Sequence, residues 1–225
     1  MQVGFRSLET LIIKDLPQFL TIWHEQLAPD SFCKLKTVDV QKCQSLITIF
    51  GAGIMGRLNA LVSLKLTQCK SLQLVFEQEG FTAKETVDAS ITLEYCPNLG
   101  SVNIEYCESL RNIFPASVAK GLPQLRQLMV SQCNRVEEIV AMEGLGMTSP
   151  TFVFPNATSV EFIYLPQLAS FYPGMHTSVW PLLERLRLLG CKKVDIFALE
   201  FSRFQAQPEL DLVGKRPLFL IQKVS

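Results

Sequence analysis

Apolar residues recur along this chain at fixed intervals that match neither a single helix nor a single strand. Counted from Leu35 as position 0, they fall at +3, +5, +8, +11, +14 and +15. In the first clear copy they are Leu35, Val38, Val40, Cys43, Leu46, Ile49 and Phe50. The series returns from Leu61 to Phe76 and from Leu125 to Val140, and the interval from Cys43 to Cys69 equals that from Cys107 to Cys133. The chain is therefore built of repeats, and the residue number rises by 26 from one repeat to the next.

These positions predict a short strand followed by a turn and an apolar return segment. Positions +3 and +5 point to one face of an extended chain, and +4 and +6 point to the other. Positions +8, +11 and +14 have no period of two and suit a chain that runs back with single apolar side chains facing inward. One such coil cannot cover its own apolar side chains, so neighbouring coils stack with their strands parallel. The alternative, a set of amphipathic helices with chance spacing, does not explain the constant cysteine at +8.

The repeat length lies within the roughly 20–29 residues of leucine-rich repeats. We therefore expect an α/β solenoid, a leucine-rich repeat horseshoe with about seven to eight short parallel strands on the concave face and loops and short helical turns on the convex face. Residues 1–200 are predicted to form the solenoid, with polar insertions near 77–89 and 142–151, and residues 201–225 a C-terminal capping tail. No equivalent cap precedes the first repeat, so we expect the chain to be the C-terminal part of a longer protein.

One step in the series is irregular. Cys96 follows Cys69 at nearly the regular interval and fits the +8 position, yet Cys107 follows Cys96 after less than half of that interval. The segments SITLEYCPNL and SVNIEYCESL look like copies of each other. Because this short step leaves too little chain for a full coil, residues 90–98 are predicted to form either a truncated, irregular repeat or a loop on the convex side.

The cysteines belong to the repeat pattern rather than to a disulfide framework. Those at +8 are Cys43, Cys69, Cys107, Cys133 and Cys191, while Leu16 and Leu165 hold this position in two other repeats. A small apolar group with a weak S–H donor suits a buried corner. No Cys-x-x-Cys pair occurs and the chain has only 2 histidines, which argues against zinc. We expect reduced, inert core thiols and a cytoplasmic protein.

Composition and charge exclude several classes of protein. The 225 residues are 48% hydrophobic and 19% charged, which is typical of a globular chain. Lys and Arg (21) balance Asp and Glu (21), which argues against a general affinity for nucleic acid or acidic membranes. No apolar run approaches the roughly 18 residues of a membrane span, and the N-terminus lacks the order of a signal peptide.

No arrangement of side chains indicates catalysis. His24 and His176 fall on a predicted outer turn and in a loop, where we expect them to be exposed to solvent. The carboxylate pair Glu137-Glu138 lacks the surroundings of a pocket and is expected on a solvated face. We therefore expect no enzymatic activity, no metal site and no cofactor.

The outward positions of the strands are the candidate interaction surface. Side chains at +2, +4, +6 and +7 point away from the core and are predicted to line the concave face. The candidate contact residues are Asp39, Lys65, Asn103, Glu105, Tyr106, Met129, Glu161, Ile163, Tyr164, Arg185 and Arg187. The later strands combine methionine, aromatic and arginine side chains, which interaction hot spots favour. Alternatively, Ile163, Tyr164 and Leu189 pack under the C-terminal tail as cap contacts.

Several stretches resemble one family. The pattern Leu-x-x-Leu-x-Leu-x-x-Cys-x-x-Leu-x-x-Ile-Phe, together with FCKLKTVDVQKCQSLITIF, QLRQLMVSQCNRVEEIV, FYPGMHTSVWPLLERLRLLGCKKVDIFA and PLFLIQKV, resembles the leucine-rich repeats of plant coiled-coil, nucleotide-binding disease resistance proteins. The resemblance covers nearly the whole chain. The sequence contains no Gly-x-x-x-x-Gly-Lys-[Ser/Thr] phosphate loop, so the nucleotide-binding domain that such receptors carry upstream is not part of it.

The resemblance implies a non-enzymatic recognition module of an intracellular immune receptor. Its expected partners are a pathogen effector or host guard protein, sensed in the defence response, and the nucleotide-binding domain of the same receptor, which the repeats restrain. The alternative is a substrate adaptor of the F-box type for ubiquitination, whose repeats also carry cysteine. The absence of an F-box segment and the receptor-like tail weigh against that alternative.

Overall fold

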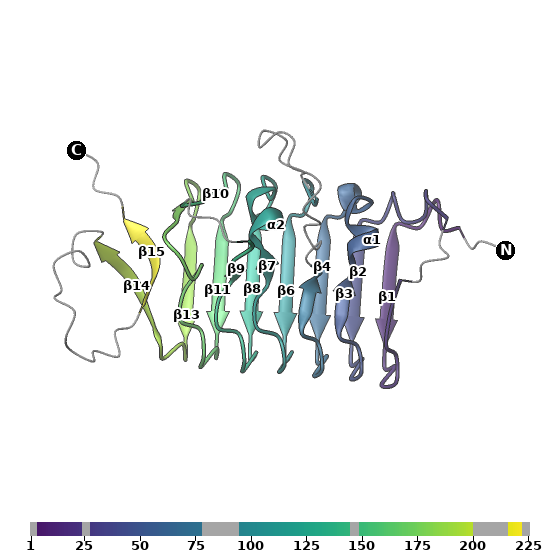
Figure 1. The fold of residues 1–225 in the computed structure, drawn as a ribbon, viewed down its shortest axis with the longest axis horizontal. Helices are drawn as coiled ribbons and strands as arrows, with labels where there is room; N and C mark the ends of the chain where they lie inside the picture. Colours follow the sequence, from purple (N-terminus) through teal and green to yellow (C-terminus); the bar gives the residue numbers. More distant parts are fainter. Residues whose placement is uncertain (1–3, 24–27, 78–94, 145–148, 200–215, 222–225) are drawn as a thin grey trace.

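Seven parallel strands form one sheet in chain order along the long axis of the molecule (Figure 1). The structure is a computed structural model that describes residues 4–23, 28–77, 95–144, 149–199 and 216–221. The strands are β1 (Thr10–Lys14), β2 (Thr37–Gln41), β4 (Ser63–Thr67), β6 (Ser101–Glu105), β8 (Gln127–Ser131), β11 (Ser159–Ile163) and β13 (Arg185–Leu189). The parallel-strand solenoid predicted from the repeat period is confirmed. Each coil is named below by its strand in this sheet.

The alternation within each strand separates core from surface as the pattern predicts. Val38 and Val40 of β2 and Leu64 and Leu66 of β4 are fully buried, whereas Lys65 between the latter two is exposed. Corresponding positions pair across the sheet without a shift in register, for example Leu66 with Ile104. One continuous apolar core therefore runs through the stacked coils, which is how a solenoid covers surface that a single coil would leave exposed.

The convex side carries short strands and little helix. Its paired strands are β3 (Thr48–Phe50) with β5 (Leu74–Phe76), β7 (Phe114–Pro115) with β9 (Val140–Ala141), and β10 (Thr151–Val153) with β12 (Thr177–Val179). Its helical segments are α1 (Ala52–Met55), the 3₁₀ turn η1 (Leu58–Ala60) and α2 (Ala116–Lys120). The predicted loops and short helical turns are thus present, with extended segments between them.

Aromatic side chains at position +15 stack from coil to coil beneath this side. The rings of Trp23, Phe50, Phe76 and Phe114 follow one another with centroid separations of 6.0, 5.2 and 6.0 Å. Aromatic pairs at such separations each add about 0.5–1.5 kcal/mol beyond their buried area. The stack therefore ties the first four coils together on the side opposite the main sheet.

Cysteines at position +8 form a second row through the core. The Sγ of Cys69 lies 3.7 Å from Thr67 O in its own coil and 3.8 Å from Val40 O in the preceding coil. The thiols of Cys43, Cys69, Cys107 and Cys133 are free and buried, as predicted, and Cys191 is half-buried. Burial of Cys43 raises the pKa of its thiol, which keeps the thiol protonated and unreactive.

The +8 side chain contacts the preceding coil, and this explains one departure from the prediction. Leu16 occupies the +8 position of the β1 coil, yet its side chain is 46% exposed, whereas Cys43 is fully buried. Within the described residues, no coil lies on the outer side of β1 to cover Leu16. The position is therefore apolar in sequence but buried only where a preceding coil is present.

Cys96 holds a different position from the one predicted. The carbonyl of Cys96 accepts a hydrogen bond from Leu99 N at 3.1 Å, just as Leu58 O does from Leu61 N at 3.0 Å. These bonds close a corner before each strand, at position −3, and a similar bond from Leu72 N to Cys69 O closes the corner after it. The short step from Cys96 to Cys107 is thus the regular spacing between the two corners of one coil.

The sheet passes directly from the β4 coil to the β6 coil. Ser63 pairs with Ser101 and Thr67 with Glu105, so no further strand intervenes. Residues 95–98 form the corner before β6. The predicted insertion near 77–89, and the part of the irregular repeat before residue 95, lie outside the described residues except for Glu77.

A column of left-handed backbone follows the strands. The residue at +7 has positive φ in every coil of the sheet: Asp15, Lys42, Gln68, Tyr106, Gln132, Tyr164 and Gly190. Six of these are not glycine, although this conformation costs other residues roughly 1–2 kcal/mol. This conformation lets the N–H at +7 add one hydrogen bond to the ladder between neighbouring strands of the main sheet. Gln68 N, for example, donates to Glu105 O at 2.9 Å. The conformation turns the chain sharply into the +8 corner.

His176 is buried, contrary to the prediction of an exposed loop histidine. Its side chain is only 5% exposed and lies among the rings of Phe152, Phe171 and Tyr172, at centroid separations of 5.6 to 6.0 Å. Nδ1 lies 3.1 Å from Gly174 O, and Nε2 has no hydrogen-bond partner. Burial lowers the pKa of the imidazole, which favours its neutral form. His24 lies outside the described residues.

The C-terminal end departs from the regular path. From Val194 the chain forms β14 (Val194–Leu199), which pairs in parallel with β15 (Arg216–Ile221) in a separate sheet (Figure 1). In the described part of the chain, β13 has no strand on its outer side. The capping role expected for residues 201–225 stays a prediction.

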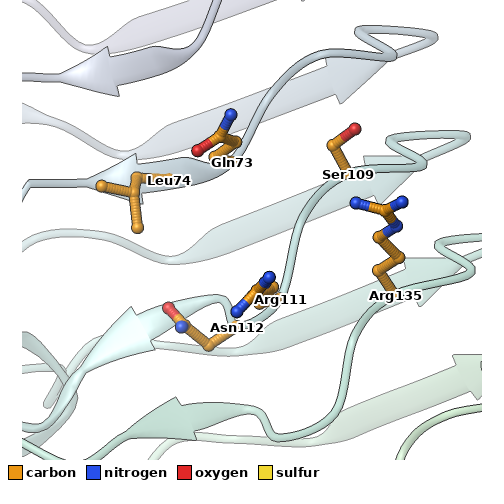
Figure 2. Close-up of a pocket in the computed structure, with 6 residues that line it drawn as sticks. All are labelled: Gln73, Leu74, Ser109, Arg111, Asn112 and Arg135. Atoms are coloured by element: carbon orange, nitrogen blue, oxygen red, sulfur yellow. The ribbon is translucent and has the colours of Figure 1, made fainter.

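The backbone ladder on the convex side is incomplete between the β4 and β6 coils. At position +12, Gln73 N donates to Ile47 O at 2.9 Å and Glu137 N donates to Arg111 O at 2.9 Å. Between Arg111 and Gln73, which hold the same position in the adjacent β6 and β4 coils, no such bond forms within the described residues. An open notch lies there, lined by residues of three consecutive coils (Figure 2).

Candidate interaction surface

Side chains at +4 form a row across the outward face of the main sheet. Strand register places Ile12, Asp39, Lys65, Asn103, Met129, Glu161 and Arg187 next to one another in this order. All of them are exposed or half-buried, whereas their neighbours at +3 and +5 are buried in the five inner strands, β2 to β11. The structure therefore places the six predicted residues of this row side by side, together with Ile12, which was not singled out from the sequence.

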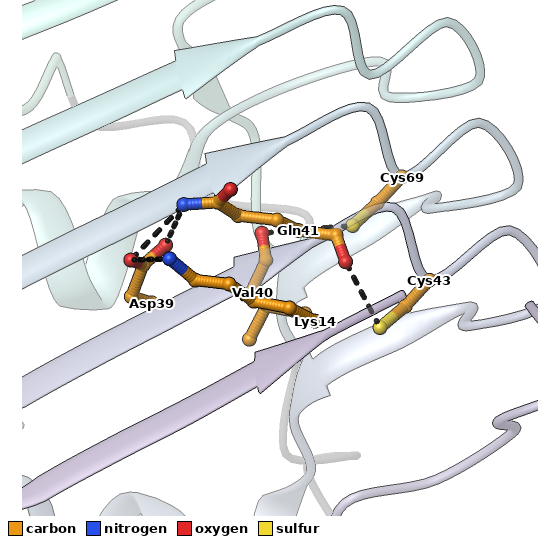
Figure 3. Close-up of polar contacts among 6 residues, drawn as sticks. All are labelled: Lys14, Asp39, Val40, Gln41, Cys43 and Cys69. Carbon is orange, nitrogen blue, oxygen red and sulfur yellow. Dashed lines mark hydrogen bonds and ion pairs between the residues drawn. The ribbon is translucent and has the colours of Figure 1, made fainter. Parts of the chain in front are cut away.

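The early part of the row is occupied by polar contacts (Figure 3). Asp39 forms an ion pair with Lys14 at 3.3 Å and accepts hydrogen bonds from Gln41 Nε2 at 2.8 and 3.0 Å. A carboxylate with several partners in its own sheet has less to gain from a ligand, because those contacts are lost on binding. Asp39 is therefore a weaker candidate for a contact residue than the sequence alone suggests.

The last two strands present two arginines around one carboxylate. Glu161 lies 3.4 Å from Nη1 of Arg187 and 3.8 Å from Nη1 of Arg185. The arginine side chains are 54% and 71% exposed, while the Glu161 side chain is only 16% exposed. Ion pairs of exposed side chains contribute about 0–1 kcal/mol, so the guanidinium groups remain available to a partner at small cost.

A second row, at position +7, carries two tyrosines at the edge where the strands end. Gln132 Nε2 donates to Tyr106 OH at 2.8 Å, which joins neighbouring coils. Tyr164 occupies the next place in this row and lies over Gly190. Of these residues, the sequence indicated Tyr106 and Tyr164; Gln132 was not singled out, although its place at +7 beside two tyrosines could have indicated it.

Apolar and aromatic side chains gather over β8, β11 and β13. Met129 and Ile163 are half-buried, whereas Tyr164 is 58% and Leu189 is 41% exposed. Such a cluster beside arginines has the composition of an interaction hot spot. Tyr164 and Leu189 are thus open to solvent within the described residues, and the alternative of contacts with the C-terminal tail stays a prediction, because most of residues 201–225 lie outside them.

The remaining predicted contact residues lie elsewhere in the outward face. Lys65 is exposed on β4, and Asn103 and Glu105 are half-buried on β6. They are separated from β11 and β13 by the β8 coil. The structure thus divides the predicted residues into an early polar group and a late group that mixes apolar and arginine side chains.

The described residues contain no group of three or more His, Cys, Asp or Glu side chains suited to a metal ion. None of the helices among these residues is long and apolar enough to cross a membrane. The outward face of the sheet therefore remains the candidate site, as a surface for contact with a partner.

Comparison with known families decides the origin of this repeat. A model of the leucine-rich repeats of RPS2-like plant disease resistance proteins matches residues 7–96 and 88–134, more than half of the chain. The chain belongs to this family. The two matches overlap at residues 88–96, around Cys96, where the sequence fits two registers. No curated protein and no solved structure matches the chain.

Membership in the RPS2-like family agrees with the resemblance seen in the sequence. The protein is a leucine-rich repeat module of the plant disease resistance type. Such modules generally serve recognition rather than catalysis and mediate contacts with other proteins. In this module, the outward face over the late strands has the exposure and composition that such contacts favour.

Proposed function

We propose that this RPS2-like repeat module senses a pathogen effector or a host guard protein and restrains the nucleotide-binding domain of its own receptor. The observation that carries the proposal is the exposed cluster over β8, β11 and β13, where Tyr164 and Leu189 lie beside Arg185 and Arg187. Rigid strands hold these side chains, so little ordering is needed when a partner docks.

The restraint is a shift between two populations. In the resting receptor the cluster packs against the nucleotide-binding domain, and a sensed protein that binds the released state preferentially moves the equilibrium toward it. The same residues then contact either the nucleotide-binding domain or the sensed protein, so the two contacts exclude each other. We place this activity in the cytoplasm, which the free thiols buried in the core support.

The test measures association of the chain with the nucleotide-binding domain of its receptor. Tyr164→Ala combined with Arg187→Ala is expected to weaken this association by roughly tenfold or more, because hot-spot residues dominate binding energies. Lys65→Ala, which removes an exposed charge from the same face three strands away, is the matched control and should bind like the wild type. Unchanged binding of the double variant would refute the assignment of this surface.

The F-box-type adaptor is the alternative function considered from the sequence. The match to disease resistance proteins gives it no support. An adaptor would associate with ubiquitin-ligase subunits, so recovery of such subunits with the full-length protein would revive it.

A further inference from the structure

The convex side carries a polar notch that the proposed recognition surface does not use. Gln73, Leu74, Ser109, Arg111, Asn112 and Arg135 line an open cavity of about 370 Å³ (Figure 2). These residues come from the β4, β6 and β8 coils, on the segments that run back after each +8 corner. They offer two guanidinium groups, two amides and a hydroxyl.

The notch lies where the backbone ladder of the convex side is incomplete, although Phe76 and Phe114 still stack between the same two coils. The stretch of chain from Leu61 to Leu99 is longer than the step between regular coils, such as that from Leu35 to Leu61. On the outward face β4 and β6 still pair in register. On the convex side, however, the bond expected from Arg111 N to Gln73 O does not form within the described residues. The Arg111 N–H thus has no backbone acceptor among the described residues and is counted as a further donor at the notch.

Within the part of the chain that the structure describes, the arginines of the notch are not paired with carboxylates. Neither Arg111 nor Arg135 forms an ion pair within the described residues, although both are exposed. The nearby Glu108 pairs with Lys70 at 3.3 Å. Glu137 follows Arg111 in the +12 row, but only their backbones are bonded. The notch thus combines positive charge with an excess of hydrogen-bond donors.

We infer that this notch binds a phosphate monoester group. A phosphate monoester has three terminal oxygens and accepts several hydrogen bonds at once from donors of the kinds that line the notch, namely guanidinium groups, a backbone N–H and a hydroxyl. A carboxylate has only two oxygens for the same donors, so it leaves more of them without a partner. The phosphate belongs either to a phosphorylated side chain of a partner protein or to a small phosphate ester, since both present the same group.

The experiment is an NMR titration of the backbone amides of the chain with inorganic phosphate at constant ionic strength. The Arg111 amide is expected to shift saturably. Arg111→Gln combined with Arg135→Gln should weaken binding by roughly tenfold or more, because each lost charge-assisted bond contributes at least about 1.4 kcal/mol, a factor of ten. Because both side chains are exposed, the double variant should keep its melting temperature.

The matched control is Lys120→Gln combined with Arg126→Gln, which makes the same charge change at two exposed residues outside the notch and should bind phosphate like the wild type. Two probes then distinguish a phosphorylated partner protein from a small phosphate ester. If a phosphoserine peptide binds more tightly than glycerol phosphate, the site recognises a partner protein. If the two bind equally, the site recognises a small ester. Absence of a saturable shift, or equal weakening in both double variants, would overturn the inference, since the latter means non-specific attraction of anions.

Discussion

The ring of Tyr164 lies directly over the Cα of Gly190 in the next coil. A Cβ built on Gly190 would come within 2.6 Å of Tyr164 Cδ1, closer than real Cβ atoms approach. The two residues hold the same +7 position in adjacent coils, and Gly190 has a φ of +68°. The glycine therefore gives the tyrosine the place from which it projects into the candidate surface.

Replacing Gly190 by alanine should displace the Tyr164 ring and destabilise the chain by about 1–3 kcal/mol, because steric conflict adds to an unfavourable backbone conformation. Chemical denaturation measures the stability, and the NMR signals of the Tyr164 ring report its position. Gly56→Ala is the control, since a Cβ there meets nothing within 4 Å. A Gly190→Ala variant with wild-type stability and unshifted ring signals would disprove the contact.

The left-handed column predicts a stabilising substitution. Gln68 has a φ of 56°, and glycine adopts this conformation without strain. Gln68→Gly should therefore raise the free energy of unfolding by about 0.5–1 kcal/mol, because the relief of strain exceeds the cost of the greater conformational entropy of glycine in the unfolded chain. Gln124→Gly, at an exposed turn position without positive φ, lacks the compensating relief and should be neutral or destabilising. Equal effects of the two changes in urea denaturation would count against the strain.

Neighbouring residues of β4 should respond in opposite ways to truncation. Leu66→Ala should cost about 2–5 kcal/mol because it leaves a cavity in the core between stacked coils. Lys65→Ala should change stability by less than about 0.5 kcal/mol because the side chain is exposed. Thermal unfolding of both variants checks the inward and outward assignment, and a reversal of the two effects would exclude it.

The buried His176 predicts a loss of stability in acid. Its pKa is lowered in the folded chain, so the unfolded chain binds the proton more readily. The neutral imidazole therefore supports folding fully above the unfolded pKa of about 6.5, and this support is lost as the pH falls below that value. Unfolding measured from pH 7.5 to 5 should show this dependence in the wild type and a weaker one in His176→Leu. Equal slopes would contradict the assignment.

The sequence predicted the sheet and its two faces because the evidence for them is local. Leu64, Lys65 and Leu66 alternate as the strand alternates, and stacking leaves the inner positions no exposure. Cys96 was assigned to the wrong corner because both corners of a coil accept a small apolar side chain, and residue type alone does not distinguish them.

Other features depend on contacts between distant segments. His176 is buried by Phe152 and Phe171, which reach it only once the sixth coil has closed. The contact of Tyr164 with Gly190 requires the register of β11 with β13. The notch at Arg111 lies where a backbone hydrogen bond of the ladder is missing; the long step from Leu61 to Leu99 marks this place in the sequence, but not the missing bond.

The central claim is that the nucleotide-binding domain binds to the surface over β8, β11 and β13. It is tested most directly by hydroxyl-radical footprinting, which compares the chain in complex with that domain to the free chain. Tyr164, Leu189 and Met129 are predicted to lose reactivity on binding. Met142 and Met175, exposed near Gly174 on the convex side, should react equally in both states. Protection of Met142 and Met175 with unchanged oxidation of Tyr164 and Leu189 would contradict the account.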